Sequence, residues 1–292
     1  MRVSEIAMVT PKTVMECLMY LSNRGQDARL LAGGTDAIVQ MKEKVGRPKI
    51  WINIGKLDEL RFIREVGNEI HIGSLSTHTE LANSKLIRSR ASVLAEAAER
   101  VGATQIRNMG TIGGNIATAS PAGDTLPALY VLDAELELQS FAKKRRIKIA
   151  DFFLGPRRTL LQNDEIITKI IIKPMQENEI GIFEKLGPRR AQAISIVNVA
   201  IKLSMGSKAR QCLAGKIAFG SVAPTIVRAS KCEAMLTLGL LTDQHIEDIG
   251  KVAWREVSPI SDIRASAIYR KDMAGALLIR GLYRLMKRWE DQ

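Results

Sequence analysis

The chain is poor in the residues that hold metals and redox clusters. Its three cysteines, Cys17, Cys212 and Cys232, lie far apart and form no C-x-x-C pair. An odd number of cysteines at such separations gives no disulfide framework, so each is predicted to be a buried reduced thiol. The three histidines show no metal-ligand spacing. The residues therefore offer no candidate for a metal site or an iron–sulfur cluster.

Aromatic residues and long apolar runs are also scarce. Aromatics make up 4% of the chain, too few for the stacking platforms that bind single-stranded nucleic acid. No apolar run approaches the ~18 residues of a membrane span, and the N-terminus lacks the apolar core and cleavage site of a signal peptide. We therefore expect a cytoplasmic protein with no membrane span.

Acidic residues are outnumbered, and the formal net charge is +12. Such a surface favours anionic partners, but the basic residues are spread along the chain. The densest run, Lys143 to Lys148, lies between two short apolar segments and is predicted to be a solvated hairpin tip, because charge runs usually face solvent. A nucleic-acid partner is not expected.

Hydrophobic periodicity predicts an α+β chain. Residues 1–55 have the pattern of helix, strand, helix and strand, which indicates a small α/β unit with some parallel pairing. Thr10 is predicted to cap the first helix, with Pro11 as its first residue. Residues 56–175 carry a hairpin pattern, two helices and two further strands.

A domain boundary is predicted at the polar stretch 175–181, directly after Pro174. The chain beyond it, residues 179–289, first alternates with the period of strands and then with the period of helices. This order predicts an antiparallel sheet followed by helices, a second and smaller α+β domain.

Two glycine pairs stand out, in "LLAGGTD" (Leu30 to Asp36) and "TIGGNIATASPAGD" (Thr111 to Asp124). Each follows an apolar segment and leads into polar side chains. Glycine leaves backbone N–H groups uncovered, and consecutive N–H groups in a turn can hold a phosphate. Two such turns facing each other would hold a pyrophosphate, and Asp124 could accept a hydrogen bond from a ribose. A dinucleotide is one hypothesis; ordinary turns are the alternative.

The common nucleotide and hydrolase motifs are absent. The sequence has no G-x-G-x-x-G after a strand, no P-loop, no G-x-S-x-G and no H-E-x-x-H. It also has no convincing set of nucleophile, base and acid, so the catalytic residues stay unassigned. This absence suits a protein whose cofactor carries the chemistry.

The two glycine motifs resemble the paired FAD-binding motifs of the flavoprotein (medium) subunit of molybdenum hydroxylases, the family of xanthine, carbon monoxide and nicotinate dehydrogenases. "WINIGKLDELRFI", "IHIGSLSTHTEL" and "DIRASAIYR" also resemble family sequence, so the resemblance covers most of the chain. It implies a two-part FAD-binding fold of the vanillyl-alcohol oxidase-like (PCMH) type, with subdomains at about residues 1–55 and 56–175. The family's small C-terminal domain would follow at 179–289.

The resemblance also implies the cofactor site. Amides of the first motif would bind the pyrophosphate, and the second motif would hold the other side and the adenosine ribose. The implied FAD-binding residues are Leu31, Ala32, Gly33, Gly34, Thr35, Asp36, Val101, Thr111, Ile112, Gly113, Gly114, Asn115, Thr118, Gly123, Asp124, Ile167 and Lys185. Val101 would lie near the flavin or adenine, Ile167 would pack on the cofactor, and Lys185 would lie at its edge.

Neither glycine motif contains a histidine, so we expect non-covalent FAD. A valine at Gly34 or Gly113 is predicted to lower FAD affinity while leaving the fold mostly intact.

The activity implied by the resemblance is electron transfer by an oxidoreductase subunit of the xanthine dehydrogenase type. Electrons would come from [2Fe-2S] clusters on a small partner subunit and leave through FAD to NAD or another acceptor. Molybdopterin would reside on a large partner subunit, and the complex could be a dimer of heterotrimers. The alternatives are a stand-alone FAD-dependent oxidoreductase of the same fold and, less in keeping with the glycine motifs, a non-enzymatic basic binding module.

Overall fold

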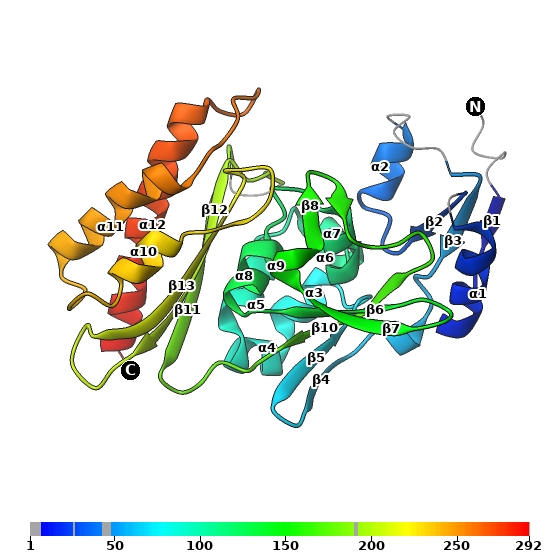
Figure 1. Ribbon diagram of the computed structural model, residues 1–292, viewed down its shortest axis with the longest axis horizontal. Helices are drawn as coiled ribbons and strands as arrows, with labels where there is room; N and C mark the ends of the chain where they lie inside the picture. The colour runs from blue at the N-terminus through cyan, green and yellow to red at the C-terminus, as the bar shows by residue number, and fades with distance from the viewer. Residues whose placement is uncertain (1–6, 26, 43–47, 190–191, 292) are drawn as a thin grey trace.

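The computed structural model describes residues 7–25, 27–42, 48–189 and 192–291. The elements form three units along the longest axis of the molecule (Figure 1). The N-terminal unit, in blue, stands at one end, and the C-terminal sheet with its helices stands at the other. Antiparallel sheets combined with helices confirm the predicted α+β class.

The N-terminal unit is a three-stranded parallel sheet with two helices. Its elements are β1 (Ala7–Val9), α1 (Val14–Arg24), β2 (Ala28–Leu31), α2 (Ala37–Lys42) and β3 (Ile50–Asn53). Strand β3 lies between β1 and β2 and is parallel to both. The buried side of α1, with Cys17, Leu18 and Leu21, belongs to the same apolar cluster as Ile52 of β3. The short β1 was not predicted from the sequence, because three residues carry no readable alternation.

Helix α1 begins later than predicted. Its N-cap is Thr13, whose hydroxyl accepts a hydrogen bond from the Glu16 amide at 3.1 Å. The prediction of Thr10 as cap and Pro11 as first helical residue is wrong. The sequence did contain the correct signal, since a threonine three residues before a glutamate is a capping signature.

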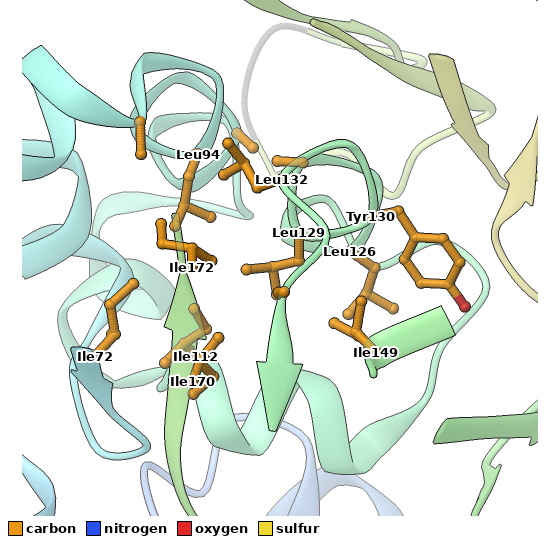
Figure 2. Packing of buried hydrophobic residues seen from close by; sticks show 14 of the residues in the cluster. Ile72, Leu94, Ile112, Leu126, Leu129, Tyr130, Leu132, Ile149, Ile170 and Ile172 are labelled. Carbon is orange, nitrogen blue, oxygen red and sulfur yellow. The ribbon is translucent and has the colours of Figure 1, made fainter. Parts of the chain in front are cut away.

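The middle unit is a five-stranded antiparallel sheet in the order β4-β5-β10-β6-β7, with helices packed on it. Its elements are the 3₁₀ helix η2 (Asp58–Leu60), β4 (Ile63–Val66), β5 (Glu69–Gly73), α3 (His78–Asn83), α4 (Lys85–Arg90), α5 (Ser92–Glu99), α6 (Thr104–Met109), α7 (Ile112–Thr118), α8 (Thr125–Val131), β6 (Glu135–Gln139), β7 (Lys144–Lys148), α9 (Ile149–Phe152), β8 (Phe153–Gly155), β9 (Arg158–Thr159) and β10 (Ile166–Ile172). Figure 2 shows Ile72 of β5 and Ile170 of β10 in one buried cluster with Leu94 of α5 and Ile112 of α7.

The basic run forms an edge strand rather than a hairpin tip. Strand β7 pairs only with β6 among the described strands, and Arg145 of β7 lies opposite Leu138. Arg145 also donates to both carboxylate oxygens of Glu165 at 2.7 Å, which lowers the pKa of Glu165. The predicted tip is therefore wrong for all but Lys143. Charged side chains along an exposed edge discourage pairing with another strand.

The C-terminal unit is a four-stranded antiparallel sheet, β11-β12-β13-β14, followed by three helices. Its elements are β11 (Glu179–Leu186), β12 (Val197–Met205), β13 (Cys212–Gly220), β14 (Val227–Arg228), α10 (Ser230–Met235), α11 (Asp243–Glu256) and α12 (Ala267–Glu290). Helices α10 and α12 lie against one face of this sheet with α11 packed on them, while α5 and α8 lie against the other face (Figure 1). Phe183, Ala200 and Ala218 accordingly belong to the core of the middle unit.

All three cysteines are buried and free, as predicted. Burial raises the pKa of the Cys17 thiol to about 12 and that of Cys212 to about 11. In the described part of the chain, no helix has both the length and the apolar character needed to cross a membrane.

Candidate functional site

A cavity of about 780 Å³ lies where all three units meet, and both glycine motifs line it. Segment 192–194 of the C-terminal unit also lines it. Of the predicted site residues, those that line the cavity are Ala32, Gly33, Gly34, Thr35, Asp36, Val101, Thr111, Gly113, Gly114, Asn115, Thr118, Gly123, Asp124 and Ile167. A second hollow, of about 910 Å³, lies between α4, β11 and α12 and contains neither motif.

Three predicted residues do not line the cavity. Leu31 is the last residue of β2, and Ile112 is fully buried in the core of the middle unit. Lys185 lies behind the wall, where its Nζ is 2.6 Å from Asp124 Oδ2. These three side chains are therefore not placed to contact a ligand in the cavity.

The first glycine motif presents free main-chain donors. The amides of Gly33, Gly34, Thr35 and Asp36 donate to no acceptor among the described residues. Gly34 has a φ of 74°, in the left-handed region that favours glycine. Successive uncommitted N–H groups in such a turn form a concave site for an anion.

The second glycine motif is not the turn that the sequence predicted. Thr111 caps α7, and Gly113 and Gly114 lie in the first turn of this helix. The Gly113 amide donates to Ser74 O at 2.9 Å, and the Gly114 amide donates to Thr111 Oγ1 at 3.1 Å. The prediction of free amides at this pair is wrong, because the helix cap Thr111 and the residue after β5, Ser74, accept their hydrogen bonds.

Gly113 is required for packing. A Cβ there would lie 2.6 Å from Ser74 Cβ and 2.7 Å from Ser74 O, so a valine would push α7 away from the segment after β5. The expectation that Gly113→Val leaves the fold mostly intact is therefore wrong.

The first motif contacts the end of α6, two residues before the second motif, and also the second motif itself. A Cβ at Gly33 would overlap the carbonyl oxygen of Met109, so the two backbones are in contact there. Thr118 Oγ1 of α7 donates to Asp36 Oδ2 at 3.1 Å. The motifs, about 80 residues apart in the sequence, thus form adjacent parts of one wall.

The carboxylate of Asp36 stands beside the free amides, where it would repel an anion. Its Oδ2 accepts hydrogen bonds from Gln40 and Thr118, and Gln40 in turn accepts one from Arg29. Hydrogen-bond donors of the protein thus stabilise the Asp36 carboxylate. Arg29 lines the same cavity.

Asp124 is held by the C-terminal unit. Its Oδ2 accepts from Lys185 at 2.6 Å, and its Oδ1 accepts from Ser195 Oγ at 2.6 Å and Asn198 Nδ2 at 3.0 Å. Burial raises the pKa of this carboxyl group, and Lys185 and the two polar donors act in the opposite direction. A carboxylate offers about four acceptor positions, and three are occupied, which leaves little capacity for the predicted ribose contact.

His78 and Ser74 also line the cavity, although sequence reasoning did not select them. His78 Nδ1 and Ser74 Oγ are buried without a hydrogen-bond partner among the described residues. Burial, with a contribution from the charge of Arg107, lowers the pKa of His78 to about 4, so its ring is neutral near pH 7. "SLSTHTEL" belongs to a stretch that resembles family sequence, but a single histidine carries no pattern that would identify it as a site residue.

These observations fit a dinucleotide such as FAD. The cavity volume lies within the ~300–1,000 Å³ that ligand sites usually have. The free amides suit a phosphate, Asn115 and Thr118 offer polar side chains, and Val101 and Ile167 supply apolar wall.

Comparison with known proteins follows the same division of the chain. Residues 4–175 match the family model of the FAD binding domain in molybdopterin dehydrogenase, and residues 183–285 match that of the CO dehydrogenase flavoprotein C-terminal domain. The chain is 35% identical over 266 residues to the nicotinate dehydrogenase FAD-subunit of Eubacterium barkeri, with 90% of each chain covered. It is 32% identical over 273 residues to the carbon monoxide dehydrogenase medium chain of Hydrogenophaga pseudoflava, covering 93% of this chain and 94% of the relative.

The same relationship holds in three dimensions. A solved structure of carbon monoxide dehydrogenase from Hydrogenophaga pseudoflava superposes with a TM-score of 0.93 at 31% identity, covering 99% of both chains. The fold predicted from the resemblance, an FAD-binding part followed by a small C-terminal α+β part, is thereby confirmed.

Proposed function

The chain belongs to the FAD-binding medium subunits of the molybdenum hydroxylases, and we propose that it relays electrons within such a complex. In this proposal it takes electrons from [2Fe-2S] clusters of a small partner subunit and passes them through FAD to NAD or another acceptor. The observation that carries the proposal is the row of uncommitted amides at Gly33 to Asp36, in a cavity that the second motif also lines.

The protein's own residues would bind and orient the cofactor. The amides of the first motif would hold the pyrophosphate, which needs donors that carry no negative charge. Asn115 and Thr118 would bind polar groups on the other side, while Val101 and Ile167 would exclude water. FAD, when bound, supplies the electron-transfer chemistry.

The partners follow from the relatives. A carbon monoxide dehydrogenase medium chain is by its name one chain of several, so we place molybdopterin and the clusters on a large and a small partner subunit. An assembly of two heterotrimers, a cytoplasmic location and an activity of the xanthine dehydrogenase type stay predictions. The relatives described above are named for nicotinate and carbon monoxide, and the substrate would be bound on a different chain.

Reconstitution tests the first part of the proposal. The purified chain is incubated with FAD and desalted, and protein-bound flavin is measured by absorbance. We expect close to one FAD per chain, released on denaturation because the attachment is non-covalent. A folded chain that retains no FAD would refute the proposal.

Electron transfer is tested with the complex isolated from its natural source. Flavin bleaching is followed after addition of the reducing substrate, with NAD and an artificial acceptor compared for reoxidation. Bleaching should require the cluster-bearing partner. Turnover by the isolated chain without any partner would instead favour a stand-alone FAD-dependent oxidoreductase.

A further inference from the structure

A buried polar cluster joins the second glycine motif to the C-terminal unit. Asp124, which directly precedes α8, accepts hydrogen bonds from Lys185 of β11 and from Ser195 and Asn198, which lie before and within β12. The side chains of Asp124 and Lys185 are only 7% and 9% exposed. Ser195 Oγ also accepts from Asn198 Nδ2 at 3.2 Å, so the cluster is internally linked.

The same cluster holds two further parts of the cavity wall. Lys185 Nζ donates to Arg100 O at 3.0 Å, next to Val101 and Gly102, which line the cavity. Ser195 directly follows segment 192–194, which lines the cavity from the C-terminal unit. The Gln192 amide donates to Gly102 O at 3.1 Å, and the Ile196 amide donates to Leu186 O at 2.8 Å.

Stability alone does not account for such a cluster. A buried ion pair contributes little net stability compared with well-packed apolar side chains, because both charges lose their water. Asn198 also keeps a buried Oδ1 without a partner among the described residues. The cluster does fix the relative positions of Asp124, the turn at Val101–Gly102 and segment 192–196. Asp124, the turn and residues 192–194 line the cavity, and residues 195–196 follow directly.

We propose that Asp124 and Lys185 are positioning residues that couple FAD binding to the packing of segment 192–196 at the cavity wall. The identity of the ligand rests on the proposed function, whereas the mechanical link between the cluster and segment 192–196 does not. A ligand that orders the end of the second motif would stabilise Asp124 in place, and Asp124 would hold the segment through Ser195.

The test combines amide hydrogen exchange with FAD titration on the full chain. In Asp124→Asn, exchange at the amides of 192–196 should rise at least about tenfold without FAD, because a neutral side chain binds Lys185 less strongly. The dissociation constant for FAD should rise by about tenfold or more. Lys185→Met should act in the same direction, and the double variant should lose less than the product of the two single effects.

Glu184→Gln is the matched control. Glu184 is the neighbour of Lys185 on β11 and is also buried in ion pairs, but its partners Arg280 and Arg284 lie on α12, away from the cavity. This variant should lower the melting temperature while leaving both FAD affinity and exchange at 192–196 unchanged. A general loss of stability is thereby separated from loss of positioning.

Each outcome decides the proposal. Unchanged exchange at 192–196 in FAD-free Asp124→Asn would overturn it, even if FAD affinity fell, because Asp124 would then act as a direct contact only. Should Asp124→Asn fail to fold, Ser195→Ala removes one hydrogen bond from the cluster and must still raise exchange at 192–196. If the wild-type chain binds no FAD, the proposed function fails, and the exchange measurement still tests the link.

Discussion

Gly33 lies directly against the end of α6, two residues before the second motif. Any side chain there would collide with the carbonyl of Met109, and a collision with backbone cannot be relieved by a rotamer change. Gly33→Ala should therefore destabilise the fold by about 1–3 kcal/mol and lower FAD affinity.

Denaturant unfolding and FAD titration measure these two effects. The control is Gly239→Ala, where a Cβ would meet nothing within 4 Å. Equal stability of the two variants would contradict the packing argument.

His78 gives the protein a specific dependence on pH. The folded-state pKa of about 4 lies below the ordinary value of 6.5 because burial disfavours the charged ring. Above pH 6.5 the ring is neutral in both states; as the pH falls toward 4, the unfolded chain takes up a proton that the folded chain does not. Stability is therefore lost over this window, by on the order of 3 kcal/mol in total.

The measurement is the free energy of unfolding of wild type and His78→Gln between pH 7 and pH 4. The wild type should lose more stability than the variant over this interval, and parallel curves would refute the prediction. His245→Gln, on α11 away from the cavity, serves as the control.

At the scale of elements, Glu184 of β11 joins this strand to α12 through ion pairs. This buried carboxylate forms ion pairs with Arg280, at 2.5 Å, and with Arg284. Both arginines are about half exposed, so they can bind water once the charge of Glu184 is removed. The loss of folding free energy is therefore moderate. Glu184→Gln should cost about 1–3 kcal/mol, which for a chain of this size is a few degrees in melting temperature.

Calorimetry of Glu184→Gln and Glu290→Gln gives the comparison. Glu290 pairs with Arg210 at 3.0 Å on the surface, where solvent screens the attraction. We expect little change for Glu290→Gln, and a similar loss in both variants would contradict the prediction.

Some of the elements could be predicted from the sequence and others could not. Alternation of apolar residues predicted β3, β5, β6 and β10 and the sheet of the C-terminal unit, because their patterns are local. The pair Gly113–Gly114 predicts a turn, since glycine is a poor helix former, yet in the structure both residues belong to α7, where the Gly113 amide donates to Ser74 O. Segment 192–194 reaches the cavity only through long-range contacts, and no local pattern marks it.

At the scale of the whole molecule, the C-terminal sheet is covered on both faces. Every residue of α8 is buried, which is typical of a helix with packing on all sides, and part of that burial comes from β12 and β13. A chain ending at residue 175 would expose α5 and α8 and leave Asp124 without its three donors.

This shortened chain should therefore aggregate or bind a hydrophobic dye, and it should bind FAD weakly. Size-exclusion chromatography and dye fluorescence measure the first property, and flavin titration the second. A soluble, monomeric fragment with native FAD affinity would show that the FAD-binding part is independent of the C-terminal unit.

The first glycine loop recognises its ligand through peptide groups, which are the same in every amino acid. Alanine in place of Thr35 would leave those donors unchanged, and this position would look silent although the contact persists. Only changes that bend the main chain, or that replace a peptide link by an ester lacking its hydrogen, would reveal how much binding the loop supplies. Peptide groups do not titrate near neutrality either, so acidity would reach this contact only through the ligand's own phosphates.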